Sequence, residues 1–247
     1  MSVLVNPYRF ATAGGGSSPD STIAALSPSA WYDPSILSSV FTGSGGTTPA
    51  AVGDPVSKLQ DLSGNGKHLV VSGVYPNNCP ILRNSGSLYW LEHTNLGHWL
   101  DCTGLTLTQP NDFAAGVWWD NIGASRNVFD GITTRQSLFE NVTGTVPSLY
   151  AGTVRSAGSA ISTGTPYVYV ARFNGGSSFI RTNGTQTAVS ASIGTNGLNG
   201  LRVGTFTSSS GQMYGRIYFL LCRDTVFDST ETTTIETYGK TKTGASF

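Results

Sequence analysis

The sequence predicts an all-β sandwich or barrel that begins with an extended N-terminal arm and ends in one short C-terminal helix. Strand-like segments recur roughly every 8 to 12 residues, the spacing typical of these folds. Between residues 27 and 225 no stretch has a convincing helical period, and no repeat of fixed length is present. The composition agrees, because the 247 residues include 31 glycines and only 11% are charged, against about 25% in ordinary soluble domains.

Residues 1–24 are predicted to form an arm that is separate from a single domain over residues 25–247. Glycines and serines at 14–18 make a flexible linker, and the segment before them is more apolar than a free tail usually is. This segment either frays or docks on a neighbouring subunit by adding a strand to its sheet. The residues expected to make that contact are Val3, Leu4, Val5, Tyr8, Arg9 and Phe10.

The domain itself is predicted to consist of short strands joined by glycine-rich turns. Asn65-Gly66 and Asn183-Gly184 supply the positive φ angles that tight turns need. Segments 42–54 and 76–80 are predicted to be loops. The expected strands are 56–61, 69–71, 105–109, 113–120, 126–129, 137–142, 148–154, 167–174, 178–182, 185–191, 201–206 and 213–222.

The segment 214–223 is the most apolar continuous run in the chain. A strand this apolar must be covered on both faces, so we expect it to lie centrally in a sheet. Arg216 and Cys222 are then structural residues beside the core.

The closing helix has clear end signals. Asp228 is a natural N-cap, Glu231 stands at the third position of a capping box, and Gly244 ends the helix. Ile235 and Tyr238 form one apolar face, which we expect to lie against the end of the sandwich.

Charge and cysteine content exclude several classes of protein. The 14 basic residues are balanced by 14 acidic ones, so no basic face for nucleic acid is expected. No secretory signal is expected, because the N-terminus has no basic region followed by an apolar one. No membrane insertion is expected, because no apolar run approaches the roughly 18–20 residues of a span. Cys79, Cys102 and Cys222 are expected to be reduced thiols, with one internal bridge as the alternative. A neutral surface favours an ordered homo-oligomer or assembly.

Five short motifs, in this order, resemble those of laminin-G-like, concanavalin-A-type jelly-roll domains. They are Ala30-Trp31-Tyr32-Asp33-Pro34, Ser63-Gly64-Asn65-Gly66, Arg181-Thr182-Asn183-Gly184, Leu201-Arg202-Val203-Gly204 followed by Tyr214-Gly215-Arg216-Ile217, and Phe227-Asp228-Ser229-Thr230-Glu231. The resemblance implies a two-sheet antiparallel jelly-roll sandwich that binds carbohydrate or protein, and it implies no reaction. Leu59 departs from the pattern, which has tryptophan there, and residues 89–100 match only loosely.

The first residues resemble the start of tailed-phage structural proteins, in the run Ser2-Val3-Leu4-Val5-Asn6-Pro7-Tyr8-Arg9-Phe10. This resemblance implies a virion protein that is made in the host cytoplasm and binds other virion proteins through its arm.

No catalytic constellation is evident, so no enzyme is expected. Jelly-roll glucanases use paired carboxylates on one strand, whereas none of Glu92, Glu140, Glu231 and Glu236 is followed by aspartate two positions later. A Gly-x-Ser-x-Gly elbow is also missing. His93, His98, Asp101 and Cys102 have no standard zinc spacing.

A structural calcium is the one cofactor that the sequence leaves open. Asp61, Asn65, Asp120 and Asp130 are the candidate oxygen ligands. In the alternative interpretation, Asp61 only caps the turn that follows it.

Glycan binding would use aromatic rings and neutral polar donors at the ends of strands. The candidate ligand-binding residues are Trp90, His93, His98, Trp99, Trp119 and Tyr150. Trp118 and Trp119 must point to opposite faces of a strand, and in the alternative interpretation most of these rings belong to the core.

Together these observations predict a non-enzymatic phage virion protein, a capsid decoration or tail-associated adhesion module that binds glycans weakly. The alternatives are a soluble or exported lectin-like module and a glycoside hydrolase.

Overall fold

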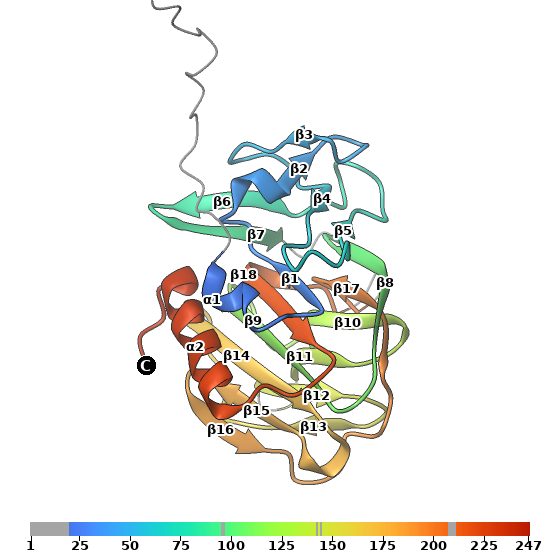
Figure 1. Ribbon diagram of the computed structural model, residues 1–247, viewed down its shortest axis with the longest axis vertical. Helices are drawn as coiled ribbons and strands as arrows, with labels where there is room; N and C mark the ends of the chain where they lie inside the picture. The colour runs from blue at the N-terminus through green and yellow to red at the C-terminus, as the bar shows by residue number, and fades with distance from the viewer. Residues whose placement is uncertain (1–19, 95–96, 142, 144, 207–210) are drawn as a thin grey trace, which may run out of the picture.

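Two antiparallel sheets pack face to face and confirm the predicted sandwich (Figure 1). The computed structural model describes residues 20–94, 97–141, 143, 145–206 and 211–247. The six residues of the predicted arm, Val3, Leu4, Val5, Tyr8, Arg9 and Phe10, lie outside the described residues. A single helical turn that was not predicted, α1 (Ser21–Ala24), precedes the first strand. No helix among the described residues is long and apolar enough to cross a membrane.

Sheet A has the strand order β16-β15-β14-β9-β18-β7-β6, and β1 pairs with β18 outside this path. Its strands are β1 (Ala30–Tyr32), β6 (Ile81–Ser85), β7 (Leu88–Thr94), β9 (Asn111–Trp119), β14 (Pro166–Phe173), β15 (Phe179–Thr182), β16 (Thr185–Ala188) and β18 (Tyr214–Arg223).

Sheet B has the strand order β13-β12-β11-β10-β17-β8-β5-β4-β2-β3. Its strands are β2 (Val40–Thr42), β3 (Thr48–Pro49), β4 (Lys58–Leu59), β5 (Leu69–Val70), β8 (Leu100–Leu107), β10 (Asn127–Thr134), β11 (Ser137–Asn141), β12 (Val146–Tyr150), β13 (Val154–Ser156) and β17 (Leu198–Val203). Two short 3-10 turns, Leu37–Ser39 and Gly175–Ser177, lie in the connections.

Strand β18 is central, as its apolar run predicted, because β9 pairs along one edge and β7 and β1 along the other. Its side chains divide between two cores. Ile217 and Leu220 point into the core between the sheets, whereas Phe219 and Leu221 belong to a second core on the outer face of sheet A. Burial on both faces explains why the run lacks the alternation of a half-exposed strand.

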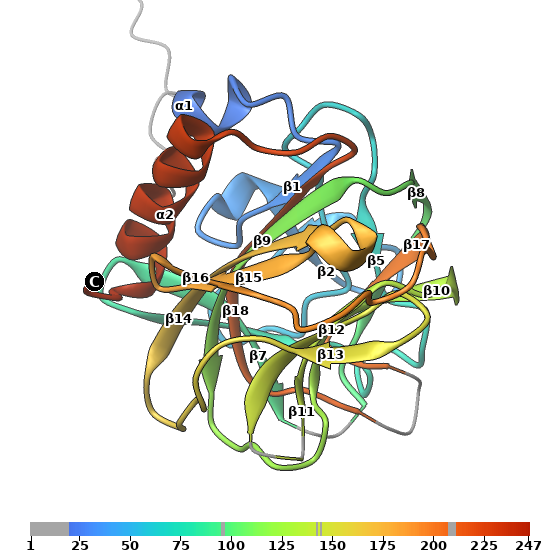
Figure 2. The same cartoon turned by 90° about the horizontal axis from the view of Figure 1, so that it is seen from below.

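Helix α2 (Ser229–Thr243) covers that outer face of sheet A (Figures 1 and 2). The predicted capping box between Asp228 and Glu231 is present, and Gly244 ends the helix at a φ of 73°. Ile235 and Tyr238 pack into the second core. Helix α2 therefore occupies one outer face of the sandwich, that of sheet A.

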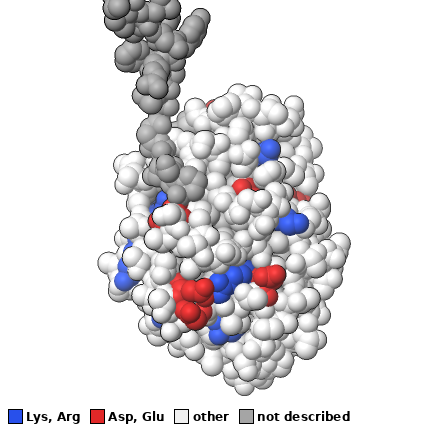
Figure 3. Space-filling view, in the orientation of Figure 1, with Lys and Arg blue, Asp and Glu red and all other residues white. Residues whose placement is uncertain are grey.

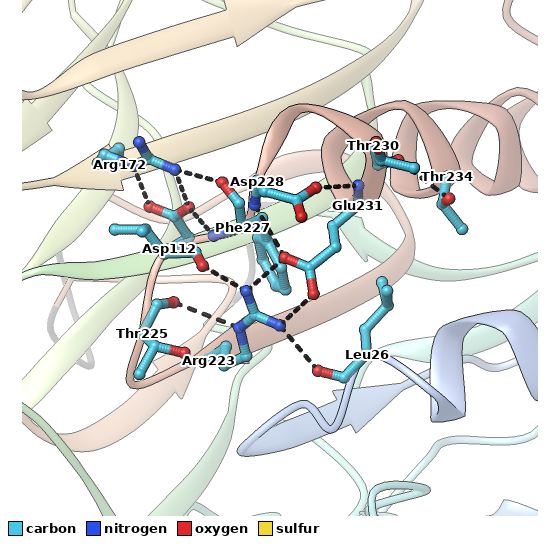
Figure 4. Close-up of polar contacts among 11 residues, drawn as sticks. Leu26, Asp112, Arg172, Arg223, Thr225, Phe227, Asp228, Thr230, Glu231 and Thr234 are labelled. Atoms are coloured by element: carbon cyan, nitrogen blue, oxygen red, sulfur yellow. Dashed lines mark hydrogen bonds and ion pairs between the residues drawn. The ribbon is translucent and has the colours of Figure 1, made fainter.

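A polar cluster around the buried side chain of Asp112 anchors the start of α2 to the sheet (Figure 4). Asp112 accepts two hydrogen bonds from Arg172, at 2.9 and 2.8 Å, and a third at 2.7 Å from the backbone N–H of Phe227. Arg223 donates to both carboxylate oxygens of Glu231 at 2.8 and 2.6 Å. In the space-filling view, charges of both signs meet over this part of the molecule, while most of the remaining face is uncharged (Figure 3).

The cysteines Cys79, Cys102 and Cys222 are free thiols and buried. Burial raises the pKa of the Cys79 thiol to about 11, so it is protonated near neutral pH.

Gly204 provides a test of the packing beside sheet B. A Cβ at this position would lie 2.3 Å from the ring of His93 and 2.8 Å from the backbone oxygen of His98, whereas at Gly53 nothing lies within 4 Å; both glycines have positive φ, +94° and +99°. We expect Gly204→Ala to lower the free energy of unfolding by about 1–3 kcal/mol more than Gly53→Ala, because only the first overpacks the interior. Chemical denaturation of the two variants checks this, and equal losses would contradict it.

Candidate functional site

Five of the six predicted ligand-binding residues are buried, which corrects the prediction for them. Their exposed fractions are 7% for Trp90, 1% for His93, 8% for His98, 6% for Trp99 and 1% for Trp119. Trp119 lies in the core between the sheets. The Nδ1 atom of His93 lies 3.1 Å from the backbone oxygen of His98, and burial lowers the pKa of His93 to about 3, so its ring is neutral at pH 7.

Tyr150, the sixth predicted residue, is half-buried and lines a recess of about 310 Å³ on the outer face of sheet B. Leu138 and Leu149 point into the core, so their neighbours Phe139 and Tyr150 point outward. The lining residues are Ala124, Ser125, Asn127, Arg135, Phe139, Tyr150, Val154, Phe206 and Gly211. Four of these residues, Asn127, Phe139, Tyr150 and Val154, lie on the adjacent strands β10 to β13. Strand β11 pairs with β10 and β12, and β12 pairs with β13.

Among the described residues, Arg135 is the one charged side chain that lines the recess. Its Nε lies 3.2 and 3.1 Å from the two carboxylate oxygens of Asp130, and its Nη2 lies 2.7 Å from one of them. The centre of the guanidinium lies 4.5 Å from the ring centroid of Tyr150 and 3.8 Å from that of Phe206. Asp130 is fully buried and Arg135 is 33% exposed, so a fixed cation faces the solvent between two aromatic rings.

The Arg135–Asp130 pair continues as a row of charges across the sheet. The strand register places Asp130 beside Arg202 and Arg202 beside Asp101. Arg202 donates to both oxygens of Asp101 at 2.8 and 2.7 Å. Positive and negative groups therefore alternate over β10, β17 and β8, and the row has no net charge.

Trp99 is linked to Asp101, the last residue of this row, through the side chain of Ser72. Its indole N–H donates to the hydroxyl of Ser72 at 2.7 Å, and that hydroxyl donates to Asp101 at 2.6 Å. Trp99 is thus held against the sheet and does not line the recess that contains Tyr150.

The pH dependence of Asp130 can be predicted. Burial raises the pKa of this carboxyl to about 6, against the opposing hydrogen bonds and charge of Arg135, so it is ionised at pH 7.5 and about nine-tenths protonated at pH 5. Because the folded pKa exceeds the unfolded one, the native state binds more protons between about pH 4 and 6, and the contribution of Asp130 to stability falls as the pH rises through that window.

We expect the carboxyl ¹³C resonance of Asp130 to titrate with a midpoint near 6. Asp130→Asn should remove this contribution to the pH dependence of the unfolding free energy. A midpoint below about 4.5, close to that of a free aspartate, would contradict the prediction.

The four candidate calcium ligands are not brought together, which corrects that prediction. Asp61 accepts from the backbone N–H groups of Trp31, Ser63 and Lys67 and so caps the turn, as the alternative interpretation held. The side-chain amide of Asn65 donates to the backbone oxygens of Pro28 and Ser29. Asp120 accepts from the indole N–H of Trp118, and Asp130 accepts from Arg135. Among the described residues, no three His, Cys, Asp or Glu side chains are grouped to hold a metal ion.

Phe139, Arg135 and Phe206 were missed in the sequence. One signal was available for Phe139, since strands 137–142 and 148–154 were both predicted. Pairing them as a hairpin would have placed Phe139 on the same outward face as Tyr150.

The chain matches no family model, and no curated protein matches it. It is similar in structure to a GH54 α-L-arabinofuranosidase, with a TM-score of 0.65 at 10% identity over 90% of this chain and 64% of that chain. It is also similar to the sialidase of Trypanosoma rangeli, with a TM-score of 0.52 at 11% identity over 76% of this chain and 31% of that chain. The chain therefore spans about a third of the sialidase and under two thirds of the arabinofuranosidase.

A third similar structure is domain 4 of AbnA, a GH43 extracellular arabinanase from Geobacillus stearothermophilus, in complex with arabinotriose. The TM-score is 0.54 at 11% identity, over 72% of this chain and 92% of that chain. At these identities the likeness shows a shared β-sandwich fold, which occurs in glycan-related proteins.

These neighbours correct one expectation. The jelly-roll resemblance and the missing carboxylate motif led us to expect no enzyme, and that expectation is wrong, because glycoside hydrolases contain the same sandwich. The virion location and the partners of the arm stay predictions.

Proposed function

We propose that the protein binds carbohydrate in the recess on the outer face of sheet B. The observation that carries the proposal is a recess lined by Phe139, Tyr150 and Phe206, in which the last two rings flank the guanidinium of Arg135. The recess of about 310 Å³ falls at the lower end of the roughly 300–1,000 Å³ typical of small-molecule sites. A fold shared with glycan-related proteins supports the same conclusion.

The chemistry of the recess fits a sugar ring. Aromatic faces stack on the apolar C–H face of a pyranose or furanose, and a tyrosine hydroxyl adds a polar contact at the edge. Arg135 uses Nε and Nη2 to hold Asp130. Its Nη1 has no partner within the part of the chain that the structure describes, which leaves a donor for a sugar oxygen.

A glycan array that includes arabinofuranosyl, xylosyl and sialyl oligosaccharides tests the proposal. The full chain and Arg135→Ala are compared at equal concentration, and circular dichroism checks that the variant is folded. Saturable binding by the wild type, weakened in the variant, is expected. Absence of binding to every glycan, or equal binding by the variant, would overturn the proposal. Reducing ends released from the bound glycans are assayed in parallel, so that any hydrolysis is detected.

A further inference from the structure

A second recess, of about 630 Å³, lies between α1 and α2, on the opposite side of sheet A from the glycan recess. Both cartoon views show the two helices side by side (Figures 1 and 2). We call it the threonine groove. Its lining residues are Asp20, Thr22, Ser229, Thr230, Thr233, Thr234, Thr237, Tyr238 and Thr241.

The outward face of α2 is unusual for a surface helix. Threonine is a weaker helix former than the alanine, glutamate or lysine that usually cover such a face. Yet Thr233, Thr237 and Thr241 are all exposed, although α2 is held by its caps and by its buried face. Folding alone therefore gives no reason for this row of threonines.

The threonine side chains present hydrogen-bond acceptors and methyl groups on the surface of the groove. Thr233 donates its proton to the backbone oxygen of Ser229 at 2.9 Å, Thr237 donates to that of Thr233 at 2.9 Å, and Thr241 donates to that of Tyr238. Since each proton is used inside the helix, each oxygen presents only lone pairs outward. The matching partner has backbone N–H donors and apolar side chains.

The spacing of the row fits an extended peptide. Thr233, Thr237 and Thr241 stand four residues apart, which is about 6 Å per step along a helix. In an extended strand, N–H groups on one side repeat every two residues, about 6.6 Å apart. Three donors and three acceptors therefore stay in register within roughly 1–2 Å over the length of the row.

The chain itself supplies such a peptide among the residues that precede Asp20. Its described part begins at Asp20, which lines the groove. Residues 3–10 include the apolar side chains of Val3, Val5 and Phe10. In an extended strand, positions 4, 6 and 8 present their N–H groups on one side, and this set does not include Pro7, which has no N–H. Residues 11–19 span at most about 30 Å when extended, enough to reach along the roughly 22 Å of a 15-residue helix.

We propose that the threonine groove is a docking surface for an extended peptide and that residues 3–10 of the same chain occupy it. The tether favours this segment over that of a second copy, because a short flexible linker gives an effective concentration in the millimolar range. The inference is independent of glycan binding on sheet B.

Hydrogen exchange of the full chain at micromolar concentration tests the proposal. Amides of residues 4–8 are expected to exchange at least about tenfold more slowly than an unstructured peptide of the same sequence, and tenfold dilution should not change this. Unprotected exchange would overturn the proposal. Protection that falls on dilution would identify a second copy as the occupant and overturn the assignment to the same chain.

The double variant Thr233→Lys/Thr237→Lys places two charges in the groove while keeping good helix formers. It should remove the protection of residues 4–8 but leave that of the α2 amides intact. Thr103→Lys/Thr106→Lys, which adds the same charge at exposed positions of β8, is the matched control and should change neither. Retained protection in the groove variant would contradict the assigned surface.

Discussion

Replacing Asp112 with alanine is expected to lower the free energy of unfolding by about 3–5 kcal/mol, the range found when one partner of a buried ion pair is removed. Its carboxylate is fully buried, and Arg172, its ion-pair partner, is only 21% exposed. The substitution leaves the Arg172 guanidinium without its carboxylate and the N–H of Phe227 without its acceptor. It therefore also loosens the link between sheet A and the start of α2.

Chemical denaturation at pH 7 measures this loss. The control is Glu92→Ala, which breaks the Arg83–Glu92 pair, whose side chains are 44% and 27% exposed. Exposed pairs contribute roughly 0–1 kcal/mol, so the control should lose at most about 1 kcal/mol. Equal losses in the two variants would show that the cluster at the start of α2 does not act as a buried anchor.

Tyr150→Ala is expected to weaken binding of the strongest array glycan by tenfold or more, which corresponds to about 1.4 kcal/mol or more. The ring lines the recess and lies 4.5 Å from the Arg135 guanidinium, so its loss removes a stacking surface and one wall that fixes Arg135. Tyr150 is only half-buried, and the fold should tolerate the change.

Isothermal titration calorimetry with that glycan measures the effect. Tyr214→Ala removes the same atoms from a residue that is 37% exposed on sheet A, and it should leave the dissociation constant unchanged. If both variants bind as the wild type does, Tyr150 is not part of a binding site. If both bind more weakly, the effect is not specific to the recess.

Much of the fold could be predicted from local patterns. The capping residues Asp228 and Gly244 define the ends of α2, and the apolar run at 214–223 identifies the central strand. Strands β6 and β7 were missed because Arg83 and Asn84 interrupt their apolar pattern and residues 89–100 matched the expected motif only loosely. Strand β6 pairs with β7, and β7 pairs with β18; this pairing between distant segments orders both strands.

The candidate site was predictable only in part, for a reason of geometry. The alternation of side chains along a strand assigns them to two faces of the sheet. It does not show which face is exposed to solvent when a helix covers the outside of one sheet. Trp90 lies on that covered face of sheet A and belongs to the second core. Tyr150 lies on the outer face of sheet B, away from α2. The row that joins Asp130, Arg202 and Asp101 depends on strand pairing between distant segments, which no local pattern reveals.

The most direct test of the central claim is the set of amide and side-chain NMR shifts that change when the strongest array glycan is added. We expect the changes to centre on Phe139, Tyr150 and Phe206 and to include the Nε–H of Arg135. Changes confined to the outer face of sheet A or to the threonine groove, with those four residues unmoved, would contradict it.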